Sequence, residues 1–179
     1  MRTTDLALDA LGRVHELIPV VLADLSADDV VWRPDPGANS MGWLVWHLLR
    51  VEDDHVAGLD GRDQVWADGW RERFDLPYPT DSHGYGMTPE QVAAFTVTGP
   101  EVLVEYADAV WQQTRHVLGG LTEDDFDRVV DQNWDPPVTL GVRLVSVIND
   151  TGQHIGQVGY VRGLLERSKG TDSSWKGHA

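Results

Sequence analysis

The chain has 179 residues, of which 41% are hydrophobic, so it can bury a core and is not an intrinsically disordered chain. Its 29 acidic and 14 basic side chains give a formal net charge of −15, which disfavours nucleic acid or an anionic membrane as a partner. It has no cysteine, so disulfides, thiolate ligands and cysteine nucleophiles are excluded. Since no apolar run is long enough to span a bilayer and the N-terminus lacks a signal-peptide pattern, we expect a cytoplasmic protein.

The first predicted element is a long amphipathic helix over residues 3–25. Pro19 is expected to kink it or to remove one backbone hydrogen bond. Ser26 fits the N-cap of a short helical turn that ends near Trp32, and residues 33–39 form a predicted loop. The helix is predicted because apolar side chains recur at steps of three and four, at Leu8, Leu11, Val14, Ile18, Leu22 and Leu25.

A second long helix is predicted from Asn39 or Ser40 to about Leu59. Residues 62–87, which follow it, differ in kind because they are rich in aromatic residues, proline and glycine. We predict a short helix over about 63–73 and then an aromatic-rich loop that packs across the other helices. Long segments of this type are often binding elements. The aromatic residues are Trp66, Trp70, Phe74, Tyr78 and Tyr85.

Two capping patterns predict the next helices. Thr88, followed by proline and then by Gln91, is typical of a capped short helix. Residues 98–101, Thr-Gly-Pro-Glu, repeat the pattern at the start of a third long helix, which should end at Gly119 and Gly120.

A final long helix is predicted from about Leu140 to Arg167. Before it, Thr122 should cap a short turn, and residues 131–138 should be irregular because they contain two prolines. No window shows a convincing strand alternation.

Four long helical segments joined by loops and short helices predict an all-α four-helix bundle. We expect one domain over residues 1–167 and a polar C-terminal tail over residues 168–179. No glycine-rich turn follows a strand, so dinucleotide-binding and phosphate-loop chemistry is not expected.

Polar side chains interrupt the apolar inward faces of the second and last long helices. His47 stands between Leu44 and Val51, whereas Asp150 and His154 are four residues apart and project from one helix face. Such groups cost free energy unless they are paired or bind a ligand. Two imidazoles and a carboxylate from two helices fit a divalent metal with an open fourth position, as in catalytic zinc sites; nickel, iron and manganese also suit this set.

A structural interpretation of the same residues stays open. Asp150 and His154 could form a helix-surface ion pair worth about 0.2–0.5 kcal/mol. His47 could be a buried histidine that bonds to a backbone carbonyl.

Two segments resemble the DinB-like superfamily, and the resemblance extends to about residue 167. They are Gly42-Trp-Leu-Val-Trp-His-Leu-Leu-Arg-Val-Glu and Asn149-Asp-Thr-Gly-Gln-His-Ile-Gly-Gln-Val-Gly-Tyr-Val-Arg-Gly. The resemblance implies a four-helix bundle with one metal held by a histidine of the second helix and a pair on the last helix, here His47, Asp150 and His154. The superfamily includes the metal-binding domain of mycothiol-dependent maleylpyruvate isomerase, whose branch has Glu-x-x-x-His. In this chain the first residue of the pair is Asp150, whose side chain is one methylene shorter than that of glutamate.

The resemblance also implies a function. The chain is similar to metal-dependent enzymes in which the metal, expected here to be zinc, binds a low-molecular-weight thiol of the mycothiol type. Such enzymes catalyse an S-transferase or isomerase reaction on a small molecule. The alternatives are a metal-dependent hydrolase and a non-catalytic metal- or ligand-binding domain. The isomerase relatives carry a further C-terminal domain, so their substrate does not transfer. Bundles of this type often pair, which makes a homodimer an expected assembly.

Other side chains could line the same cavity or orient a metal ligand, namely Asp54, His55, Gln157 and Arg162. His83 and the pair Trp66 and Trp70 could cover the site, although aromatic residues at helical spacing more often belong to the core. Two arginines could meet an anionic substrate, but salt bridges are expected for them in so acidic a chain: Arg50 and Arg143. Three further histidines are expected at the surface or in the tail: His15, His116 and His178.

Overall fold

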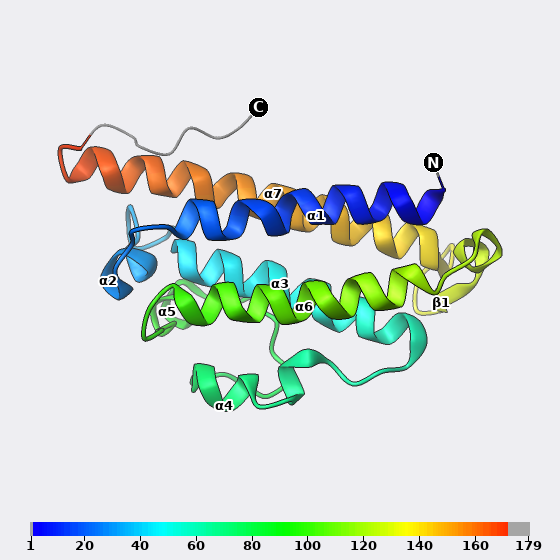
Figure 1. The fold of residues 1–179 in the computed structure, drawn as a ribbon. Coiled ribbons are helices and arrows are strands. Elements are labelled where there is room, and N and C mark those ends of the chain that lie inside the picture. The colour runs from blue at the N-terminus through cyan, green and yellow to red at the C-terminus, as the bar shows by residue number, and fades with distance from the viewer. Residues whose placement is uncertain (1, 172–179) are drawn as a thin grey trace.

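The computed structural model describes residues 2–171 and confirms the predicted all-α fold (Figure 1). In this part of the chain, α3 packs against α6 and α7, and α1 packs against the same two helices. None of the described helices is both long and apolar enough to cross a membrane. The long helices of the bundle are α1 (Thr3–Leu22), α3 (Met41–Asp60), α6 (Glu101–Gly119) and α7 (Leu140–Ser168).

Short elements close the two ends of the bundle (Figure 1). At one end lie α2 (Ala27–Val31) and α5 (Pro89–Ala93). At the other, the 3-10 helix η2 (Glu123–Asp127) precedes an antiparallel pair of strands, β1 (Val129–Asp131) and β2 (Val138–Thr139). Residues 132–137 are irregular, as expected, but the short strands on either side of them were not predicted. The two strands have only three and two residues, too few to show the alternation on which a strand prediction depends.

Capping residues set most helix boundaries. The Ser40 hydroxyl accepts a hydrogen bond from the Trp43 backbone N–H at 3.2 Å, so α3 begins where predicted. It ends at Gly61, whose φ of 73° is the left-handed conformation that glycine adopts without strain. The capping box of Thr88 and Gln91 is also confirmed. The predicted cap at residue 98 is wrong, because α6 begins after Pro100, which makes no side-chain capping bond within the described chain.

The segment between α3 and α5 contributes aromatic side chains to the core. The helix predicted over residues 63–73 divides into the 3-10 helix η1 (Val65–Ala67) and α4 (Trp70–Phe74) at Gly69, where φ is 76°. Both Trp66 and Phe74 are buried, and their rings lie 5.6 Å from the ring of Tyr106 on α6. The aromatic side chains of this segment therefore stabilise it against the bundle.

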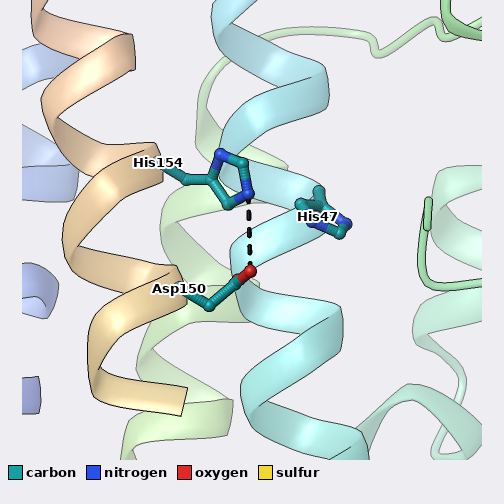
Figure 2. Close-up of side chains that lie close together, drawn as sticks. All are labelled: His47, Asp150 and His154. Carbon is teal, nitrogen blue, oxygen red and sulfur yellow. Dashed lines mark ion pairs between the residues drawn. The ribbon is translucent and has the colours of Figure 1, made fainter. Parts of the chain in front are cut away.

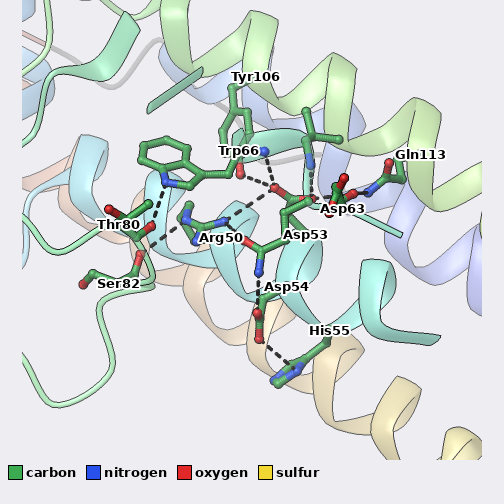
Figure 3. Close-up of polar contacts among 12 residues, drawn as sticks. Arg50, Asp53, Asp54, His55, Asp63, Trp66, Thr80, Ser82, Tyr106 and Gln113 are labelled. Carbon is green, nitrogen blue, oxygen red and sulfur yellow. Dashed lines mark hydrogen bonds and ion pairs between the residues drawn. The ribbon is translucent and has the colours of Figure 1, made fainter. Parts of the chain in front are cut away.

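One turn of α3 fixes this segment through buried charges (Figure 3). The Asp53 carboxylate accepts hydrogen bonds from the backbone N–H groups of Val65 and Trp66, both at 2.8 Å. The Arg50 guanidinium donates to Gln64 Oε1 at 2.8 Å and to the Ser82 carbonyl at 3.3 Å. Because Gln64 and Ser82 lie near opposite ends of the segment, α3 holds both of its ends.

The expectation that His15 lies at the surface is wrong. Its ring is buried and stacks on Trp111 with 5.0 Å between centroids, and its Nε2 lies 3.0 Å from each Glu52 carboxylate oxygen. Thr114 also donates to Glu52, at 2.6 Å. A buried carboxylate must be paired, and the partners of Glu52 come from α1 and α6. The network therefore joins α1, α3 and α6. His116 is exposed, as predicted, and His178 lies outside the described residues.

Gly42 lies where α3 packs tightly against neighbouring residues. A Cβ there would lie 2.5 Å from Val30 Cγ1 and 2.9 Å from Phe95 Cε1. We predict that Gly42→Ala lowers the free energy of unfolding by about 1–3 kcal/mol, because the added methyl overpacks a filled core. Urea unfolding followed by circular dichroism measures the change.

Gly58 supplies the matched control on the same helix. It is exposed, and no described atom lies within 4 Å of a Cβ added there. Gly58→Ala should therefore raise the free energy of unfolding by about 0.5–1 kcal/mol, since alanine favours the helix. Equal effects of the two substitutions would contradict the packing described for Gly42.

Candidate metal centre

The structure brings His47 of α3 together with Asp150 and His154 of α7 (Figure 2). One potential ligand atom of each residue lies within 4.8 Å of those of the other two. The two imidazole rings meet edge to face, with 4.7 Å between centroids, and His154 Nε2 lies 3.6 Å from Asp150 Oδ1. Such a cluster of nitrogen and oxygen atoms is compact enough to surround one ion.

The cluster lies just beneath the surface. His47 is 6% exposed, whereas the side chains of His154 and Asp150 are 19% and 33% exposed. The side contributed by α3 is therefore closed by protein, and the side contributed by α7 is open to small molecules.

The His47 ring is fixed by two neighbours. It stacks on Trp43, with 4.9 Å between centroids and 14° between ring planes. Its Nδ1 makes a short hydrogen bond with the backbone carbonyl of His83. Because a carbonyl can only accept, Nδ1 carries the proton and Nε2 keeps a free lone pair. Burial lowers the pKa of His47, which favours the neutral ring that a metal needs.

On α7, the Nδ1 of His154 also has a hydrogen-bond partner. His154 Nδ1 lies 2.8 Å from Gln157 Oε1, which leaves Nε2 on the side of Asp150. The Asp150 carboxylate beside it raises the pKa of His154 against the effect of burial. Burial acts to raise the pKa of Asp150, but the ion pair with His154 and the other nearby histidines outweigh it and the pKa is lowered. Asp150 is therefore ionised at neutral pH.

Asp150 also shows that these residues fit a cation. Its Oδ2 is buried and has no hydrogen-bond partner among the described residues. A buried carboxylate oxygen without a partner costs free energy. A divalent ion between Asp150 and the two Nε2 atoms would satisfy that oxygen, and two imidazoles with one carboxylate are a ligand set that zinc and related metals accept.

The other candidate residues lie at different distances from the cluster. Gln157 contacts it directly through His154. His55 is half-buried, with Nδ1 3.5 Å from Asp54 Oδ2, and both residues line a cavity of about 310 Å³ beside the strands. Arg162 does not join them: its guanidinium donates to Glu166 and to the carbonyls of residues 21 and 23 at the end of α1.

The salt bridges expected for both arginines are confirmed, at 3.5 Å from Arg50 to Asp53 and 2.7 Å from Arg143 to Asp131. The idea that Trp66 and Trp70 cover the site is wrong, because both rings pack on Tyr106.

Sequence reasoning missed two residues that hold His47: Trp43, one turn earlier on α3, and Gly84, which lies against the imidazole. It named His83 as a possible cover of the site, but not the contact of its backbone carbonyl with His47. The only available signal was the pair of glycines around Tyr85, which suggests a tight backbone but names no contact.

Comparisons with known proteins agree with the observed fold. The sequence profile of the DinB superfamily matches residues 10–158. A crystal structure described as the conserved protein of locus from Enterococcus faecalis is 35% identical to this chain, with a TM-score of 0.86, and the match covers 92% of this chain and 98% of that one. No curated protein matches the chain.

The tautomer of His47 is directly testable. We predict that its proton resides on Nδ1, because the His83 carbonyl accepts from that atom. Long-range proton–nitrogen correlation spectra of the protein without added metal distinguish the two neutral tautomers. A ring protonated on Nε2 alone would contradict the geometry described here.

Proposed function

The chain belongs to the DinB superfamily, and from this we propose that it is a metal-dependent enzyme whose ion is bound by His47, Asp150 and His154. The observation that carries the proposal is the buried, unpartnered Oδ2 of Asp150 beside two imidazoles whose Nδ1 atoms are both engaged within the described chain. A purely structural cluster would gain stability by pairing that oxygen.

Three protein ligands leave a position for a small molecule, which separates a catalytic site from a closed structural one. The bound metal would supply a Lewis acid that favours the thiolate form of a low-molecular-weight thiol. We propose zinc as the ion, and a thiol-dependent S-transferase or isomerase as the enzyme class. The support for this class is the Asp150-x-x-x-His154 pair, which resembles the Glu-x-x-x-His pair of the mycothiol-dependent isomerase branch.

The chain's own residues would place the substrate beside the metal. Gln157, which contacts His154, also lines a cavity of about 450 Å³ together with Leu44 and Tyr160. A small molecule in this cavity would contact Gln157, the hydrogen-bond partner of His154. Trp43 and the His83 carbonyl close the side of the cluster contributed by α3, so that solvent is excluded from the His47 ring.

Metal content tests the first part of the proposal. Protein prepared without an affinity tag and loaded with zinc should hold about one ion per chain by mass spectrometry of the dissolved metal. His154→Ala should lose the ion but keep its helix content, since the ring is partly exposed and lies at the edge of the core.

The control for this experiment is His116→Ala, an exposed histidine on α6 that contacts Arg62. Its zinc content should equal that of the unaltered chain. Full occupancy in His154→Ala, or a loss in His116→Ala as well, would reject the proposed ligands.

Thiol binding tests the second part. In the cobalt-loaded protein, N-acetylcysteine should produce a sulfur-to-cobalt charge-transfer band, because the thiolate enters the open position. N-acetylserine, which replaces the sulfur by oxygen, is the matched control and should not. If the spectrum of the metal-loaded protein does not change on addition of the thiol, the result would support a metal-dependent hydrolase or a non-catalytic binding domain instead.

A further inference from the structure

The segment of residues 82–84 lies directly on the His47 ring. The His83 carbonyl accepts the hydrogen bond from His47 Nδ1. The next residue, Gly84, is buried with φ of 97°, and a Cβ there would lie 2.8 Å from His47 Nδ1 and 3.0 Å from Trp43 Cζ2. Only a residue without a side chain lets the backbone approach the imidazole this closely.

Contacts on both sides of His83 hold the segment in this position. Before it, Arg50 donates to the Ser82 carbonyl at 3.3 Å, and the indole of Trp66 donates to the carbonyl of Thr80 at 3.1 Å (Figure 3). After it, the Trp43 indole N–H points at Met87 Sδ at 3.4 Å. The donors belong to α3 and to a tryptophan packed on its buried face, so the position of the carbonyl is tied to the helix that carries His47.

We propose that residues 82–84 are a positioning element for the metal centre, in which the His83 carbonyl orients the His47 ring and Gly84 provides the space for that contact. Hydrogen bonds to the second nitrogen of a ligating imidazole fix its orientation and raise its basicity. Coupling of this kind is reciprocal, so metal binding also stabilises the docked segment. The inference rests on the proposed function, because it requires that His47 bind a metal.

Gly84→Ala tests the positioning role, and Gly86→Ala is its control. Both glycines have positive φ, 97° and 73°, but no described atom lies within 4 Å of a Cβ added at Gly86. The zinc dissociation constant, measured by competition with a chromophoric chelator, should rise about 10–100-fold in Gly84→Ala. It should be unchanged in Gly86→Ala. The visible spectrum of the cobalt-loaded Gly84→Ala protein should also shift, because the geometry of one ligand changes.

Proteolysis of the unaltered chain tests the reciprocal effect without any substitution. Tyr85 is 88% exposed and follows the docked glycine, so chymotrypsin can cleave after it when the segment detaches. Saturating zinc should slow this cleavage.

The outcomes separate the two proposals. Zinc binding by the unaltered chain, with equal affinity in Gly84→Ala or with cleavage after Tyr85 unaffected by zinc, overturns the positioning role and leaves the metal site standing. Absence of zinc binding in the unaltered chain overturns both.

Discussion

Helix α3 is buried over most of its length, and its fully buried charged side chains are paired inside the protein. Glu52 is paired with His15 of α1 and Thr114 of α6. Arg50 and Asp53 are paired with each other and with the segment that follows the helix. The fold depends on these pairings, because they connect α3 to α1, to α6 and to the segment that follows it.

The same constraint explains why the candidate site is where it is. His47 is also buried on α3, and its Nδ1 is satisfied by a backbone carbonyl. Its ring lies 4.7 Å, centroid to centroid, from that of His154 on α7, where Asp150 keeps one oxygen without a partner in the described chain. The networks of Glu52 and Asp53 join elements by direct hydrogen bonds. The cluster of His47, Asp150 and His154 instead leaves one carboxylate oxygen without a hydrogen bond among the described residues. A bound cation is the partner that would complete it.

The sequence predicted those features that depend on local rules or on helical periodicity. The long helices followed from apolar spacing, and the caps Ser40 and Thr88 fixed the starts of α3 and of the short helix α5. His47, Asp150 and His154 were found because polar residues stood where a bundle core requires apolar ones.

The features that the sequence did not predict depend on tertiary contacts. His15 is buried because Glu52 lies opposite it, thirty-seven residues away. The start of α6 has no side-chain cap in the described chain, so the Thr-Gly-Pro-Glu pattern was misleading there. The contact of the His83 carbonyl with His47 uses a backbone atom, which every residue possesses and no sequence pattern marks.

X-ray absorption spectroscopy of the zinc-loaded protein tests the central claim most directly. We expect a four-coordinate ion with two imidazole nitrogens at about 2.0–2.1 Å, one carboxylate oxygen, and one ligand that the protein does not supply. A first coordination shell without imidazole scattering, or one filled entirely by protein side chains, would contradict an open site built from His47, Asp150 and His154.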